Sequence, residues 1–162
     1  MVARYARFVL LEGRKVNSTV DIPAIQRTDA ETFDVIIIGA GLSGIGTAVR
    51  LQRDCPDRDF ILLERREAIG GTWDLFRYPG IRSDSDMHTL GYDFKPWEAE
   101  KTIADGPSIL SYVNETADEY RIRERIRFSQ KLVAADWCSE RGQWELTVDT
   151  PDGVRRYRCG FL

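Results

Sequence analysis

A glycine-rich turn between an apolar run and a helical segment constrains the fold of this chain more than any other feature. Residues 33–38 are rich in β-branched side chains, as is typical of a strand buried on both faces. The turn, at residues 39–44, follows directly, and residues 42–54 have the spacing of a helix that ends before Pro56. Residues 60–64 form a second apolar run. This order predicts a βαβ unit in which the two strands are adjacent and parallel.

The turn reads Gly39-Ala40-Gly41-Leu42-Ser43-Gly44, which is the pattern G-x-G-x-x-G. Gly39 permits a tight turn, Gly41 lets the backbone approach a pyrophosphate, and Gly44 lets helix and strand pack closely. The helix N-terminus offers unpaired N–H groups and partial positive charge to phosphates. Glu64 ends the second strand, where a carboxylate can accept hydrogen bonds from a ribose diol and disfavours a 2′-phosphate. The pattern predicts a dinucleotide site but does not choose between FAD and NAD.

The rest of the chain predicts one further helix and a small antiparallel sheet. Residues 65–96 are irregular and rich in glycine, aspartate and aromatic residues, as functional loops often are. Residues 107–120 have a helical pattern, whereas residues 127–137, 143–149 and 154–159 alternate as three strands of a meander. The predicted fold is therefore α/β, Rossmann-like, with an antiparallel β-meander. Residues 1–31 have no sustained period, and we expect a poorly ordered extension before a domain over residues 32–162.

Composition limits the partners of the chain. A length of 162 residues fits one domain, and 43% apolar residues suffice for a packed core. A formal net charge of −3 gives no reason to expect nucleic-acid binding, and no apolar run is long enough to span a bilayer. The three cysteines are far apart and show no C-x-x-C spacing, which argues against a disulfide framework or a metal site and favours the cytoplasm.

A second candidate segment covers residues 70–84. Gly70 and Gly71 allow close approach of the backbone to a ligand, while Trp73 and Tyr78 offer flat apolar surface of the kind that borders a ring system. Charged side chains follow nearby, at Arg77, Arg82 and Asp84. The alternative interpretation is a surface loop that contains a structural arginine–aspartate pair.

Residues 33–94 resemble the N-terminal part of flavin-containing monooxygenases, and most of all the Baeyer–Villiger monooxygenases of the mycobacterial ethionamide-activating type. The specific motif is Gly-Gly-Thr-Trp-Asp-Leu-Phe-Arg-Tyr-Pro-Gly-Ile-Arg-Ser-Asp-Ser-Asp-Met at residues 70–87. The similarity continues more weakly to residue 162 and does not reach the first 30 residues. The resemblance implies an FAD-binding fold of the type with two dinucleotide-binding domains.

Carried over by position, the resemblance implies a set of cofactor-binding residues and no catalytic residue. Ser43 would lie at the FAD pyrophosphate, Glu64 at the adenosine ribose, and Leu132 would meet the adenine through its backbone. Asp84 would lie close to the isoalloxazine, and with Arg82 and Ser83 near the docking position of the nicotinamide. The residues that would follow the cofactor are Thr72, Trp73, Asp74 and Leu75, beside the backbone of Gly39, Gly41, Leu42, Gly44 and Gly71. His88 departs from the family's aromatic residue, and we expect a partly buried structural histidine there.

Enzymes that this chain resembles use NADPH to reduce FAD, and then oxygenate a ketone, sulfur or nitrogen of a small-molecule substrate. A second G-x-G-x-x-G for NADPH and the family's linker motif are absent from the sequence, and Phe161-Leu162 resembles the start of a further strand. We therefore expect a domain that is incomplete at its C-terminus and inactive alone. Two alternatives are a free-standing nucleotide-binding module, acting with a partner chain that carries the NADPH domain, and the NAD-binding domain of an unrelated dehydrogenase.

Overall fold

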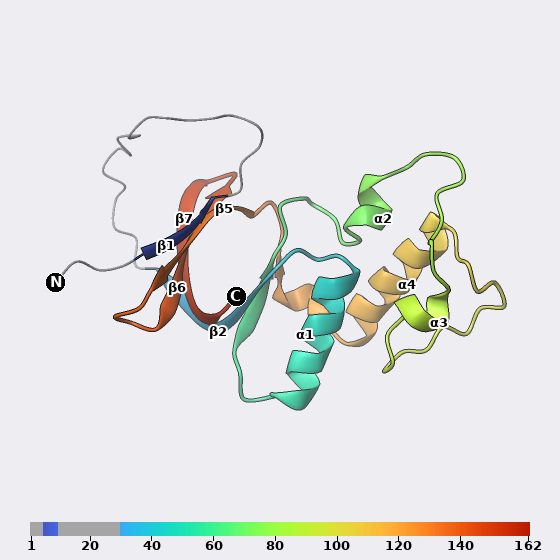
Figure 1. The fold of residues 1–162 in the computed structure, drawn as a ribbon, viewed down its shortest axis with the longest axis horizontal. Coiled ribbons are helices and arrows are strands. Elements are labelled where there is room, and N and C mark those ends of the chain that lie inside the picture. The colour runs from blue at the N-terminus through green and yellow to red at the C-terminus, as the bar shows by residue number, and fades with distance from the viewer. Residues whose placement is uncertain (1–4, 10–29) are drawn as a thin grey trace.

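The computed structural model describes residues 5–9 and 30–162, and within them one mixed sheet carries the fold (Figure 1). Its strand order is β1-β5-β6-β7-β2-β3-β4. The strands are β1 (Tyr5–Val9), β2 (Glu31–Ile38), β3 (Phe60–Leu63), β4 (Ile126–Arg127), β5 (Lys131–Cys138), β6 (Gln143–Thr150) and β7 (Gly153–Phe161). The helices are α1 (Leu42–Asp54), α2 (Thr72–Leu75), α3 (Met87–Leu90) and α4 (Gly106–Glu119), with the 3₁₀ turn η1 (Ile122–Arg125) after α4.

The predicted βαβ unit is confirmed. β2 and β3 are adjacent and parallel, with Val35 opposite Phe60 and Ile38 opposite Leu63, and α1 connects them. Successive side chains of β2 point to opposite faces, so Ile36 and Ile37 belong to different parts of the core. Both faces of the parallel pair are therefore covered, as the continuous apolar runs predicted.

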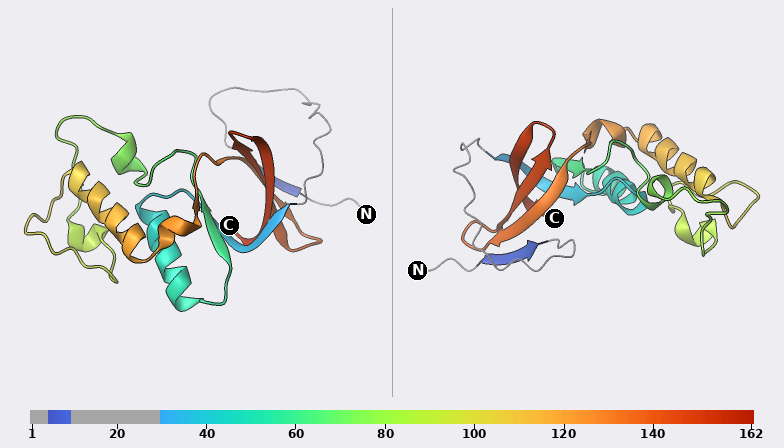
Figure 2. Two further views of the ribbon diagram at one scale, coloured as in Figure 1. Left: turned by 180° about the vertical axis from the view of Figure 1, so that it is seen from behind. Right: turned by 90° about the horizontal axis from the view of Figure 1, so that it is seen from above.

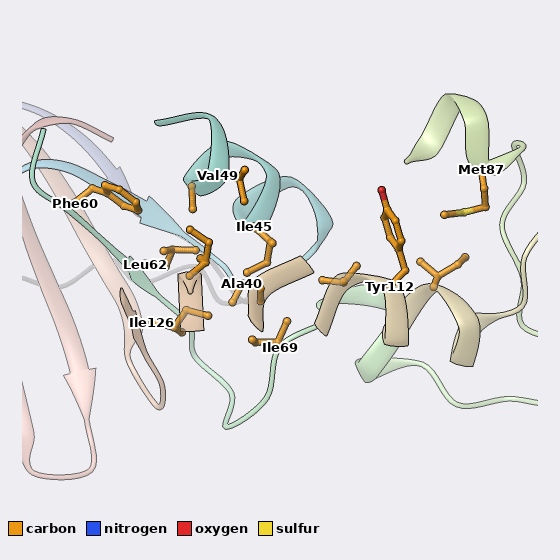
Figure 3. Close-up of a cluster of buried hydrophobic side chains, with 14 of the residues drawn as sticks. Ala40, Ile45, Val49, Phe60, Leu62, Ile69, Met87, Tyr112 and Ile126 are labelled. Carbon is orange, nitrogen blue, oxygen red and sulfur yellow. The ribbon is translucent and has the colours of Figure 1, made fainter. Parts of the chain in front are cut away.

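Helices cover one face of the parallel pair and the meander covers the other. Figure 3 shows Ile45 and Val49 of α1 above Leu62 of β3, in a cluster that continues toward Tyr112 of α4. On the opposite face, Ile36 packs in a second cluster with residues of the meander, of which the fully buried Tyr157 is the largest. Figure 2 shows the meander and the helices α3 and α4 at opposite ends of the molecule.

The three-stranded meander is also confirmed, but its last strand also pairs with β2, which the sequence analysis does not predict. β5, β6 and β7 pair antiparallel, and β7 then continues as the parallel neighbour of β2, with Tyr157 opposite Glu31 and Phe161 opposite Val35. The expectation that a new strand starts at Phe161 is wrong, because one uninterrupted strand serves both pairings. Phe161 lies at its end and is 74% exposed.

The segment that was predicted as one strand over residues 127–137 is divided. Ile126 and Arg127 form β4 beside β3, and β5 starts only at Lys131. Between them the chain turns through Ser129, whose φ is +54° in the left-handed region. The N–H of Gln130 donates to the carbonyl of Glu64 at 2.8 Å, which ties this turn to the end of β3. The alternation of apolar and polar residues along one segment cannot predict a hydrogen bond between residues so far apart in sequence.

The N-terminal segment is described only in part. β1 pairs antiparallel with the edge of β5, from Tyr5 opposite Cys138 to Val9 opposite Ala134, a pairing that the sequence analysis does not predict. Most of the expected extension, residues 1–4 and 10–29, lies outside the described residues. The poorly ordered extension over residues 1–31 therefore stays a prediction. None of the helices in the described ranges has the length and apolar character needed to cross a membrane.

Candidate functional site

The first glycine turn leaves β2 and enters α1 with very little space. Gly39 has φ +95°, and its N–H donates to the carbonyl of Leu63 at 2.8 Å. A Cβ on Gly44 would lie 1.9 Å from the carbonyl oxygen of Gly39. No side chain fits there, which confirms that Gly44 is needed for close packing of the helix against the strand.

The first turn of α1 is held from outside the βαβ unit. The Tyr92 hydroxyl donates to the carbonyl of Leu42 at 2.6 Å, and burial raises the pKa of this phenol, so that it remains a donor. The ring of Tyr92 lies 2.7 Å from where a Cβ on Gly46 would be, so glycine is required at that position as well. The N-cap is Gly41, and the first turn of α1 contains no acidic residue. This helix N-terminus is therefore suited to an anion.

Glu64 joins the end of β3 to the glycine turn. Its side chain is buried, yet both oxygens have backbone partners: Oε2 accepts from the N–H of Ala40 at 2.7 Å, and Oε1 from the N–H of Arg66 at 2.9 Å. Each carboxylate oxygen has a second acceptor site beyond these bonds. The Glu64 carboxylate can therefore position the turn and still accept hydrogen bonds from a ribose.

A second glycine turn lies directly against the first. Gly70 and Gly71 have φ values of +126° and +53°, and the N–H of Gly70 donates to the carbonyl of Ala40 at 3.0 Å. A Cβ on Gly71 would lie 3.0 Å from the Cα of Gly41. The two turns, distant in sequence, thus form one backbone surface at the carboxyl ends of β2 and β3, where open α/β sheets bind ligands.

A cleft of about 550 Å³ opens beside these turns. Six of the predicted site residues line it, namely Gly39, Glu64, Gly71, Thr72, Leu75 and Leu132. Arg65, Arg66, Gln130 and Lys131 also line it but are missing from the sequence prediction. The two arginines follow Glu64 directly, a signal that the sequence offered. Gln130 and Lys131 reach the cleft only through the turn at Ser129. With Asp149, the lining holds three cationic and two acidic side chains, a slight excess of positive charge.

The other predicted residues lie outside the cleft lining. Gly41, Leu42, Ser43 and Gly44 form the turn and the first residues of α1 next to it, and Trp73 packs partly against the core.

Asp74 is buried, and its carboxylate is bound by Arg66 and Arg77. Arg82 and Asp84 are exposed, and the buried Ser83 donates its N–H to the carbonyl of Ala104 at 3.0 Å. His88 is exposed on α3, so the expectation of a partly buried histidine is wrong.

A parallel strand pair joined by a glycine turn and helix, with a buried acid at the end of the second strand, defines a Rossmann-type dinucleotide-binding domain. The comparisons with known proteins agree. Residues 37–99 match the model of the NAD(P)-binding Rossmann-like domain. Together with the antiparallel pairing of β5, β6 and β7, this match confirms the expected α/β, Rossmann-like fold with its meander.

Relatives narrow this class further. The chain is 53% identical to the FAD-containing monooxygenase EthA of Mycolicibacterium smegmatis, over 82% of this chain and 27% of that protein. It is 52% identical to the putative FAD-containing monooxygenase MymA of Mycobacterium tuberculosis, over 80% and 27%. The crystal structure of cyclohexanone monooxygenase from Rhodococcus sp. Phi1 bound to NADP⁺ matches with a TM-score of 0.70 and 27% identity, over 81% of this chain and 25% of that one.

The chain is thus a homologue of the FAD-containing monooxygenases, over their N-terminal region, and its structural neighbours are Baeyer–Villiger monooxygenases. It spans only about a quarter of the length of these relatives.

Proposed function

We propose that this chain binds FAD and forms the FAD-binding part of an NADPH-dependent flavin monooxygenase. The observation that carries the proposal is the cleft at the carboxyl ends of β2 and β3, where two glycine turns and the Glu64 carboxylate meet. Its donor and acceptor set suits a dinucleotide: a carboxylate for a ribose, a helix N-terminus for phosphates, and apolar side chains for a ring. The relatives whose names specify FAD support the choice of cofactor.

In this proposal the residues bind and orient the cofactor. The backbone of Gly39 to Gly44 and the first turn of α1 face the pyrophosphate, with Ser43 exposed beside it. Glu64 accepts hydrogen bonds from the adenosine ribose, and Leu132, which lines the same cleft, meets the adenine. Thr72 and Leu75 line the same cleft and would continue toward the flavin. Arg82, Ser83 and Asp84, which lie outside the cleft lining, would serve the nicotinamide side.

When bound, FAD supplies the redox chemistry and the activation of oxygen, as cofactors do for chemistry that side chains cannot perform. We propose NADPH as the reductant and a small ketone as the substrate, with oxygenation of sulfur or nitrogen as the related possibility. The Baeyer–Villiger structural neighbours favour the ketone. A complementing chain that carries the NADPH domain remains part of the proposal.

We further propose that the protein works in the cytoplasm. Cys138 and Cys159 are buried free thiols, and burial raises the pKa of the Cys159 thiol to about 11. Such thiols are typical of a reducing compartment.

The test is a comparison of dinucleotides on the purified chain. FAD, NAD⁺ and NADP⁺ are each titrated, with flavin fluorescence for FAD and calorimetry for all three. We expect FAD to bind most tightly and NADP⁺ to bind weakly, because Glu64 lies where a 2′-phosphate would bring negative charge. Preferential binding of NAD⁺ would instead favour the NAD-binding domain of a dehydrogenase, which the matched NAD(P)-binding family model keeps open.

A further inference from the structure

The second glycine turn is fixed by a buried carboxylate that the sequence analysis placed along the cofactor. The Asp74 side chain is 7% exposed, and each oxygen is bound by a different arginine: Oδ2 by Arg66 and Oδ1 by Arg77. The Nε of Arg77 also donates to the Asp74 carbonyl at 3.0 Å. Because Asp74 is buried outside the cleft lining and each of its oxygens holds an arginine, Asp74 is better placed to hold protein groups than to contact a ligand.

Arg66 connects this carboxylate to the cleft. Its Nη1 donates to the carbonyl of Gly71 at 3.4 Å, and its backbone N–H donates to Glu64. Its side chain is 28% exposed and lines the cleft, whereas the Arg77 side chain is 71% exposed and does not. Asp74 and the Gly71 carbonyl each take one N–H of the Arg66 guanidinium, and the remaining donors of that group are left for an anion.

Charge and position favour a diphosphate as that anion. Two arginines surround a single carboxylate at the second turn, so one positive charge is in excess there. This turn touches the first glycine turn at Gly41, beside the acid-free N-terminus of α1. An arginine held in a fixed orientation suits the paired oxygens of phosphate groups.

We propose that Arg66 is a diphosphate-binding residue of this site and that Asp74 is the positioning residue that holds it. The Arg66–Asp74 pair locks the second glycine turn against the first, and the guanidinium then presents its remaining N–H groups to the diphosphate of a bound dinucleotide. This inference rests on the proposed FAD site and adds two roles to it.

The experiment uses the whole chain and two probes, ADP and adenosine, which differ only in the diphosphate. Titration calorimetry of Arg66→Gln should show ADP affinity reduced about ten-fold or more, because a charge-assisted hydrogen bond is lost. Adenosine affinity should not change. Arg66→Lys, which keeps the charge but not the planar fork, should restore part of the ADP affinity. Arg53→Gln is the control, since it removes an exposed arginine from the opposite end of α1, and it should leave ADP affinity within about two-fold.

The role of Asp74 is tested by non-additivity. Asp74→Asn should weaken ADP more than adenosine, and the Arg66→Gln/Asp74→Asn double variant should lose no more ADP affinity than Arg66→Gln alone, because residues that act through one contact are coupled. Thermal melting of each variant reports its folding. Unchanged ADP affinity in Arg66→Gln, or an equal loss for ADP and adenosine, would overturn the inference. A parent chain that binds neither FAD nor ADP would refute the proposed function, and this inference with it.

Discussion

At the scale of single residues, Glu64 has two tasks that the structure allows us to separate. Its carboxylate holds the backbone N–H groups of Ala40 and Arg66, and it also lines the cleft. Glu64→Ala should therefore weaken FAD binding about ten-fold or more through the lost charge-assisted bond to a ribose hydroxyl. It should also lower stability by about 1–3 kcal/mol, because buried N–H groups lose their acceptor.

The measurement compares ADP with 2′,3′-dideoxy-ADP on the parent and on Glu64→Ala, with thermal melting in parallel. Removal of the ribose hydroxyls should weaken binding to the parent and have little effect on the variant. If both proteins lose the same affinity, the carboxylate does not reach the ribose.

Gly44 offers a purely steric prediction. Gly44→Ala would place a Cβ 1.9 Å from the Gly39 carbonyl oxygen, a backbone atom that cannot move without disturbing β2. We expect a loss of about 1–3 kcal/mol or more, as for other insertions into packed cores. Gly160→Ala is the control, because its nearest atom, the Asp34 carbonyl oxygen, would lie at an ordinary 3.4 Å. Urea unfolding of both variants decides the matter, and equal stabilities would contradict the close packing of α1.

At the scale of elements, Arg127 ties β4 to the first residue of β2. Its Nη2 lies 2.8 Å from the Glu31 carboxylate, and its guanidinium lies 5.2 Å from the ring centroid of Phe33. The hydrogen bond from Arg127 lowers the pKa of Glu31 below its usual value of 4.5. A lowered folded-state pKa stabilises the fold above the unfolded-state value, and this stabilisation is lost as the pH falls through the lowered one.

Glu31→Gln should accordingly reduce stability at pH 7, by less than about 1 kcal/mol because the carboxylate is half-exposed. The difference from the parent should shrink as the pH falls below 4.5. Unfolding by urea at a series of pH values measures it. Glu67→Gln, at an exposed carboxylate outside the strands, is the control and should show no such trend. A difference that grows toward acid pH would contradict the ion pair.

The contact between the two glycine turns depends on how separate elements pack together, and not on the local sequence of either turn. Each turn can be predicted from the sequence, because closely spaced glycines after a buried strand indicate a tight turn of the backbone before a helix. Their contact, Gly71 against Gly41, depends on how the loop after β3 returns over the end of β2. The Arg66–Asp74 pair has the same origin: the sequence shows both charges, and only the packed turn makes them partners.

At the scale of the whole molecule, we predict that this chain alone does not oxygenate a substrate at a meaningful rate. Its sequence contains one G-x-G-x-x-G, and in the proposed function FAD takes that site. A hydride donor must be held against the flavin, and the reacting centre must be kept from water. The cleft, open to solvent and lined by the partly exposed Leu75 and Val133, offers neither by itself.

The assay incubates the purified chain with FAD, NADPH and a panel of small ketones and sulfides. We expect no oxygenated product by mass spectrometry, and any NADPH consumption should be uncoupled from product. A full-length relative such as EthA is the positive control for the panel. Product formed in step with NADPH use would mean that the chain holds a second nucleotide site.

The βαβ unit, the meander and the glycine turn with its acid can all be predicted from the amino-acid sequence. These follow from local rules: side-chain periodicity sets helix and strand, and the missing Cβ of Gly39 and Gly44 fixes where the chain can turn and pack. The same local reasoning placed Glu64 and Gly71 at the cleft that the structure describes, whereas Leu132 was expected there from the family resemblance alone.

The neighbours of these elements depend on tertiary packing. In the packed molecule β7 pairs with β2, β4 is separate from β5, and Arg66 lines the cleft while its partner Asp74 does not. Each of these outcomes depends on hydrogen bonds or ion pairs that form between separate segments of the chain. Alternation along one segment carries no information about such partners, because they are chosen by the burial of polar groups in the packed molecule.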